Sequence, residues 1–141
     1  MIVGIGVDVV DVTRMAEILE RTPTFATRCF TDGERRDSGT GAGRAASLAV
    51  RFAAKEAVMK SMGVGLGAFG FHDAEVVKAE SGAPSLVLRG PAAVLATEHG
   101  VVRWHLSLSH TATSAIAMVV AEGGQTSNMG THAAVVSRDA P

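Results

Sequence analysis

Hydrophobic and polar residues alternate along several short stretches of this chain, a pattern typical of β-strands. In residues 2–10, one face of the expected strand is apolar, and the other carries two glycines and a carboxylate, Gly4, Gly6 and Asp8. Further alternating segments come in pairs around short turns, at residues 73–79 and 85–89 and at residues 101–110 and 114–120. Each pair predicts a β-hairpin.

Helical patterns separate these strands. Asp11 or Thr13 can cap a first helix that runs to about Arg21 before Pro23. A short helical piece follows at 25–30, and Thr31 to Glu34 has the spacing of a capping box.

The strongest helical pattern covers residues 44–62, which are rich in alanine and end at Gly63. A last helix is expected between Gly90-Pro91 and Gly100. Because the strands come in pairs, the order predicts an α+β fold with a largely antiparallel sheet and one long central helix. We expect one compact domain over residues 1–122, and a disordered tail over the polar, aperiodic residues 123–141.

Composition excludes several classes of protein. The chain has 141 residues, 47% of them apolar and 19% charged, with a net charge of −1. These values argue against a disordered chain and against a protein whose overall positive charge serves to bind nucleic acid. No apolar run approaches the ~18–20 residues of a membrane span, and the N-terminus lacks a basic signal region. Cys29 stands alone and is best explained as a small buried residue, so we expect a cytoplasmic protein.

The charge is unevenly distributed. Residues 14–60 hold nine of the thirteen cations but only six of the fourteen acids, a local net charge of +3. A basic region on a neutral protein suits a phosphorylated ligand or an acidic partner. The alternative is an ordinary solvated helix face.

Two carboxylates lie on otherwise apolar elements. Asp8 is flanked in the first strand by glycines that would let another backbone or a ligand approach. Glu56 falls within the apolar arc of helix 44–62, together with Phe52. A buried carboxylate needs a partner, and Lys60, four residues on, is one candidate for Glu56. Together the carboxylates could share a hard cation, since Mg²⁺ commonly takes one or two carboxylates plus phosphate oxygens. Taken alone, the helix is better explained as an ordinary ion-paired helix, in which Arg44, Arg51 and Lys55 form one row of cations.

Other residues admit two interpretations. Arg14, Arg21 and Arg28 recur every seven residues around Phe25, which suits docking to an acidic helix, although pairing with nearby glutamates would explain them equally. The strand that contains His105 and leads to His110 has a histidine and serine face, which is more often surface than catalytic.

Several motifs taken together resemble the holo-acyl-carrier-protein synthases, the small 4′-phosphopantetheinyl transferases. The resemblance covers residues 1 to about 122 in order, and the pairing of its first two motifs is specific. The matching segments are G-I-G-V-D at 4–8, R-F-A-A-K-E-A at 51–57 with Lys60, the glycine loop 63–67, G-A-P at 82–84, and His105 with S-H-T at 109–111.

This resemblance implies an enzyme that transfers 4′-phosphopantetheine from coenzyme A to a serine of apo acyl-carrier protein and releases adenosine 3′,5′-bisphosphate. By position, Asp8 and Glu56 would hold Mg²⁺ and Lys60 would stabilise charge on the phosphate. The general base stays open between a metal-bound water, Glu56 and His110, with water or His110 preferred.

The resemblance also implies binding surfaces. The expected nucleotide ligands are Arg51, Lys55 and His105, the expected pocket walls are Gly65, Gly67 and Pro84, and the expected carrier-protein surface is Arg14, Arg21, Phe25 and Arg28. It further implies a homotrimer with sites shared between subunits. Alternatives of other classes are a non-catalytic binder of nucleotide or carrier protein, and a structural oligomer.

Overall fold

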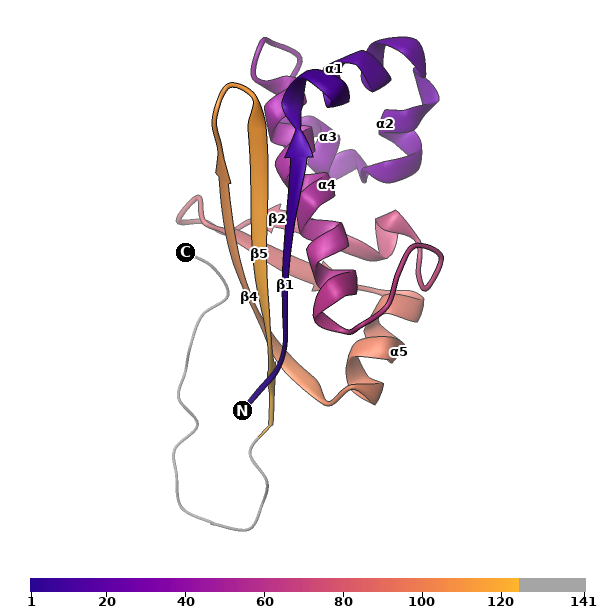
Figure 1. Ribbon diagram of the computed structural model, residues 1–141, viewed down its shortest axis with the longest axis vertical. Helices are drawn as coiled ribbons and strands as arrows, with labels where there is room; N and C mark the ends of the chain where they lie inside the picture. The colour runs from indigo at the N-terminus through magenta and orange to yellow at the C-terminus, as the bar shows by residue number, and fades with distance from the viewer. Residues whose placement is uncertain (125–141) are drawn as a thin grey trace.

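The computed structural model describes residues 1–124, and the helices and strands follow the expected order (Figure 1). The strands are β1 (Ile2–Asp11), β2 (Ala74–Lys78), β3 (Pro84–Leu88), β4 (Val101–His110) and β5 (Ser114–Gly123). The helices are α1 (Val12–Arg21), α2 (Thr24–Cys29), α3 (Asp32–Ser38), α4 (Arg44–Ser61) and α5 (Gly90–Glu98), with a 3₁₀ turn η1 (Phe71–Asp73).

Two antiparallel sheets confirm the α+β prediction. One has the strand order β1-β5-β4, and the other is the β2–β3 hairpin. In Figure 1 the long strands run side by side along α4, with α1, α2 and α3 at one end of that helix and α5 near the other. The central helix therefore packs against both sheets and against α1 and α3.

Local signals set the helix ends as predicted. The Asp11 carboxylate accepts a hydrogen bond from the Arg14 amide at the start of α1. At the start of α3, Thr31 and Glu34 form both bonds of a capping box. Most boundaries differ from the expected ones by at most one residue, but β5 runs three residues further and includes Gly123, which pairs with Val101. The rest of the predicted tail, from residue 125, lies outside the described residues.

The register of the larger sheet sorts its side chains into two faces. Residues paired across antiparallel strands point to the same side. Asp8, Ala117 and Leu108 form one row on the inner face, and Gly6 lies in the next row on that face. A Cβ on Gly6 would lie 1.9 Å from the carbonyl oxygen of Ala57 on α4. The glycines of β1 thus allow the helix backbone to touch the sheet, as their small size predicted.

The outer face of this sheet is apolar and exposed. Ile5, Val7 and Val9 are 62%, 54% and 61% exposed, and Ile116 and Met118 from β5 lie between them and β4. Single exposed apolar residues are ordinary, but a contiguous patch marks an interaction surface. The chain thus leaves a sheet face available for a partner.

None of the helices in residues 1–124 combines the length and hydrophobicity that crossing a membrane requires.

Candidate active site

Asp8 and Glu56 face one groove from two different elements. Asp8 projects from the inner face of β1, and Glu56 projects from the middle of α4. Both line a groove of about 370 Å³, together with Arg14, Met15, Phe25 and Phe52. The structure thus places the two carboxylates in one groove, and their sharing of a cation stays a prediction.

The environment of Glu56 is unfavourable for a negative charge. Burial raises the pKa of the Glu56 carboxyl, the negative charge of Asp8 raises it further, and Lys60 partly opposes both. A bound cation would remove this penalty by neutralising the two carboxylates.

Lys60 makes a contact that its sequence spacing did not predict. Its ammonium lies 3.0 Å from Asp8 Oδ1 and donates also to the carbonyl oxygen of Val7 at 3.1 Å. The expected partner was Glu56, one helical turn away. Lys60 reaches Asp8 instead because the glycines of β1 bring that strand against α4. Its side chain remains half exposed beside the carboxylate pair, where it can also meet a phosphate.

The donor set fits Mg²⁺. Within residues 1–124 no three His, Cys, Asp or Glu side chains are grouped to hold a metal. Two carboxylates are nevertheless a usual protein contribution to a Mg²⁺ site, with phosphate oxygens and water completing it. Asp8 and Glu56 supply oxygen ligands and an excess of negative charge at one place.

Lys55 does not fit its expected role. Its ammonium has no exposed surface and donates to Glu34, Phe71 and Ala74, which takes up all three of its protons. Helical periodicity placed Lys55 in a row of cations beside the apolar arc, but its side chain reaches α3 and β2 in the interior. A nucleotide phosphate would have to displace these internal partners.

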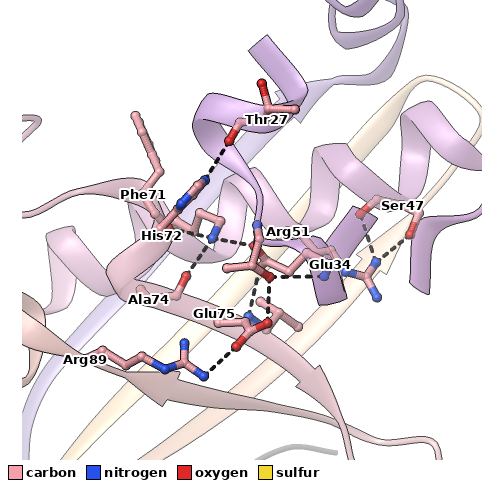
Figure 2. Close-up of polar contacts among 12 residues, drawn as sticks. Thr27, Glu34, Ser47, Arg51, Phe71, His72, Ala74, Glu75 and Arg89 are labelled. Atoms are coloured by element: carbon pink, nitrogen blue, oxygen red, sulfur yellow. Dashed lines mark hydrogen bonds and ion pairs between the residues drawn. The ribbon is translucent and has the colours of Figure 1, made fainter. Parts of the chain in front are cut away.

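Arg51 is also buried rather than solvated. Its Nη1 donates to the carbonyl oxygen of Ser47, and the Ser47 hydroxyl is a second contact (Figure 2). Burial lowers the pKa of the Arg51 guanidinium, whereas Glu34 and Asp37 act in the opposite direction. Its Nε is buried without a partner among the described residues. This orphaned donor is consistent with the expected contact to an anion.

The two histidines lie apart from the carboxylate pair. His105 belongs to the outer face, next to Val120, and its Nε2 lies 2.7 Å from Glu122 Oε1. Within a single chain, His105 and Asp8 therefore lie on opposite faces of the sheet. His110 pairs with Ala115 at the end of β4, on the inner face, and its role as a base rests on the resemblance alone.

The expected walls of the coenzyme pocket are separated in one chain. Gly65 and Gly67 belong to the exposed loop after α4, and Pro84 starts β3 at the tip of the hairpin. Figure 1 shows this loop and the hairpin tip on opposite sides of the molecule. A single pocket containing all three would need more than one chain.

The expected carrier-protein surface is continuous with the groove. Arg14, Arg21 and Arg28 are exposed, and half-buried Phe25, on α2, lines the groove. Arg14 lines both the groove and a neighbouring hollow of about 300 Å³ that includes Arg21. Arg21 also lies 3.8 Å from Glu17, a weak exposed pair that leaves its charge accessible.

Sequence reasoning missed the buried acids. Glu34, on α3, and Glu75, on β2, are both buried. Glu34 forms an ion pair with Lys55, and Glu75 forms one with Arg89. The capping-box spacing signalled that Glu34 begins a helix, but it carried no information about burial. Phe52 was predicted as core and lines the groove as well.

Comparisons with known proteins identify the family of this chain. Residues 4–119 match the sequence model of the 4′-phosphopantetheinyl transferase superfamily. The chain is 54% identical over 121 residues to the holo-[acyl-carrier-protein] synthase of Frankia alni, covering 86% of this chain and 98% of that protein.

Two solved structures are similar as well. The holo-[acyl-carrier-protein] synthase of Neisseria meningitidis superposes with a TM-score of 0.78 at 33% identity, covering 86% of this chain and 99% of the other. That of Bacillus anthracis, in complex with CoA (3′,5′-ADP), gives 0.73 at 35% identity, covering 88% and 99%. This chain belongs to the holo-[acyl-carrier-protein] synthases, enzymes of the 4′-phosphopantetheinyl transferase superfamily.

Proposed function

We propose that this enzyme catalyses Mg²⁺-dependent transfer of 4′-phosphopantetheine from coenzyme A to a serine of apo acyl-carrier protein. Family membership supports the coenzyme-A-dependent transfer, and a relative has been solved with CoA (3′,5′-ADP) bound. The observation that carries the metal requirement is the groove shared by Asp8 and Glu56, with Lys60 on Asp8.

The reaction exchanges one P–O bond for another. The serine oxygen attacks the phosphorus that bears pantetheine and gives its proton to a general base. The bond from this phosphorus to the bridging oxygen of the pyrophosphate breaks, and adenosine 3′,5′-bisphosphate leaves with the bridging oxygen. Mg²⁺, when bound, neutralises the pyrophosphate and the charge that develops during transfer. Asp8 and Glu56 would hold it, while the Lys60 ammonium would stabilise the phosphate oxygens in the transition state.

A product assay tests this proposal. Apo carrier protein, coenzyme A and the enzyme are incubated with Mg²⁺ or with excess chelator. We expect a phosphopantetheine adduct by intact mass and an equal amount of adenosine 3′,5′-bisphosphate by chromatography, both only with Mg²⁺. Coenzyme A binding without turnover would favour the non-catalytic alternative. The assay run with different carrier proteins would also decide between fatty-acid and polyketide acceptors.

The exposed cations of α1 and α2 suit an acidic helix of the carrier protein. We propose that Arg14, Arg21, Phe25 and Arg28 form this docking surface, because it leads directly into the groove. Arginines around an apolar anchor give both attraction and register.

Replacing Arg14 should weaken carrier-protein binding. We expect Arg14→Ala to raise the KM for carrier protein by about 5–10-fold, with kcat nearly unchanged, because the charge acts on encounter. Steady-state kinetics at two salt concentrations measure this, and the difference from the parent enzyme should shrink in high salt. Arg36→Ala removes another exposed arginine from α3 and is the matched control. An equal rise in KM in the two variants would contradict the docking surface.

We also propose a homotrimer with active sites shared between subunits. The exposed apolar face of the β1-β5-β4 sheet supports an interface. The separation of Pro84 from the glycine loop, and of His105 from Asp8, supports sites completed by a neighbouring subunit.

A charge on this face should separate the subunits. Met118, half exposed in the central strand, becomes cationic in Met118→Lys, and burying an unpaired ammonium in an apolar interface is costly. We expect a monomer with little transfer activity, measured by light scattering after size exclusion. Val94→Lys changes an equally apolar, 60% exposed residue of α5 and should remain trimeric. A fully active monomeric parent enzyme would overturn the shared site.

A further inference from the structure

The ammonium of Lys55 joins three separate elements in the interior. From α4 it donates to Glu34 Oε1 on α3 and to the carbonyl oxygens of Phe71 and Ala74, each at 2.7 Å. Both charged side chains have 0% exposure. Buried charges need partners, and here every proton of the ammonium has one.

Glu34 extends this network to the next strand. Its Oε2 accepts a hydrogen bond from the Val76 amide at 2.9 Å, and Oε1 accepts from the Thr31 amide at 3.0 Å. Beside it, Glu75 accepts from the Thr31 hydroxyl and from Arg89 (Figure 2). Residues 71–76 are therefore held against α3 and α4 through their backbone as well as their side chains.

The segment fixed in this way supports one wall of the groove. The Phe71 ring stacks on Phe52 with centroids 5.1 Å apart, and Phe52 in turn contacts Phe25 at 5.8 Å. Phe25 and Phe52 line the groove that holds Asp8 and Glu56. A hydrogen-bond contact of 2.8 Å between His72 Nε2 and the Thr27 carbonyl oxygen ties the same segment to α2 (Figure 2).

We infer that Lys55 is a positioning residue, which acts with Glu34 to hold Phe71 behind Phe52 and so sets the groove wall beside Glu56. This role replaces the expected contact with a nucleotide phosphate, and it rests on the proposed transfer reaction. Fixing a wall within reach of the reacting groups affects turnover strongly, since a displacement of about 1 Å can cost about a hundredfold in rate.

Separate measurements of nucleotide binding and turnover test the two roles. In Lys55→Met we expect the Kd for adenosine 3′,5′-bisphosphate, measured calorimetrically, to stay within about twofold, and kcat to fall at least about tenfold. Lys78→Met removes an exposed lysine from β2 and is the matched control. A Kd at least tenfold weaker with unchanged kcat would show a phosphate ligand and overturn the inference.

A double variant separates positioning from stability. Glu34→Leu with Lys55→Met removes both charges together, which avoids an unpaired buried ion. We expect a folded protein whose residues 71–76 exchange amide hydrogens at least about tenfold faster, with kcat reduced as in Lys55→Met. Parent-like exchange and kcat in this variant would overturn the inference.

Phe71→Leu tests the support of the groove wall and leaves Lys55 and Glu34 unchanged. It keeps an apolar side chain but removes the stacked ring, and we expect a loss in kcat without a loss of nucleotide affinity. If Lys55→Met and the double variant both fail to fold, Phe71→Leu alone tests the positioning role. A kcat equal to that of the parent enzyme would then overturn the inference. Absence of transfer in the parent enzyme would instead refute the proposed function, while nucleotide binding and hydrogen exchange would still test Lys55.

Discussion

Glu56→Gln should abolish transfer while leaving the fold intact. The amide keeps the size of the side chain but removes one of the two negative charges that would hold Mg²⁺ in the groove. We expect the rate with saturating coenzyme A and carrier protein to fall by at least about a thousandfold, because electrostatic stabilisation is the main contribution to phosphoryl transfer. The intact-mass assay measures this loss.

The stability of this variant provides its control. Burial and Asp8 raise the pKa of Glu56, so folding disfavours the charged form. A raised folded-state pKa contributes stability that is complete below the unfolded-state value and is lost as pH rises through the folded-state value. Above the folded-state pKa the parent protein has lost this contribution, so at such pH Glu56→Gln should melt at the same or a higher temperature. Glu98→Gln changes an exposed acid of α5 and should keep full activity. Substantial transfer by Glu56→Gln would refute the metal assignment.

Gly6→Ala should strongly destabilise the protein. The added methyl carbon would lie 1.9 Å from the carbonyl oxygen of Ala57 and 3.0 Å from the amide nitrogen of Ser61, both backbone atoms of α4. The strand and helix would have to separate, and we expect the free energy of unfolding to fall by about 3–5 kcal/mol, as for severe overpacking. Chemical denaturation measures the change.

A glycine in a loop provides the control for Gly6→Ala. Gly41 precedes α4, and a Cβ there would meet nothing within 4 Å. Gly41→Ala should leave stability unchanged or raise it slightly, because alanine restricts the unfolded chain. If Gly6→Ala cost less than about 1 kcal/mol, the close contact between β1 and α4 would be wrong. Activity should follow stability here, since the same contact brings Asp8 to Lys60.

The sequence predicted what depends on local pattern. The strand and helix ends followed from alternation, caps and glycines, and Asp8 and Glu56 stood out because each is a carboxylate within an apolar element. The small residues of β1 correctly indicated a close approach of another backbone.

Contacts between distant segments could not be predicted in this way. The burial of Lys55 could not be predicted, because its partners are an acid 21 residues earlier and two backbone carbonyl groups that have no sequence signature. Alternation in β1 showed two faces but not which one α4 covers, so the exposure of Val7 became clear only from the fold. The place of His105 likewise depends on strand register, which sets the face of every side chain.

Asp8 and Glu56 together should bind the divalent cation used in transfer. Mn²⁺ in place of Mg²⁺ allows the free ion to be measured by electron paramagnetic resonance, with coenzyme A present. We predict about one bound Mn²⁺ per chain for the parent enzyme, and at least tenfold weaker binding for Asp8→Asn and for Glu56→Gln. Equal binding by the parent enzyme and a variant carrying both changes would contradict the claim.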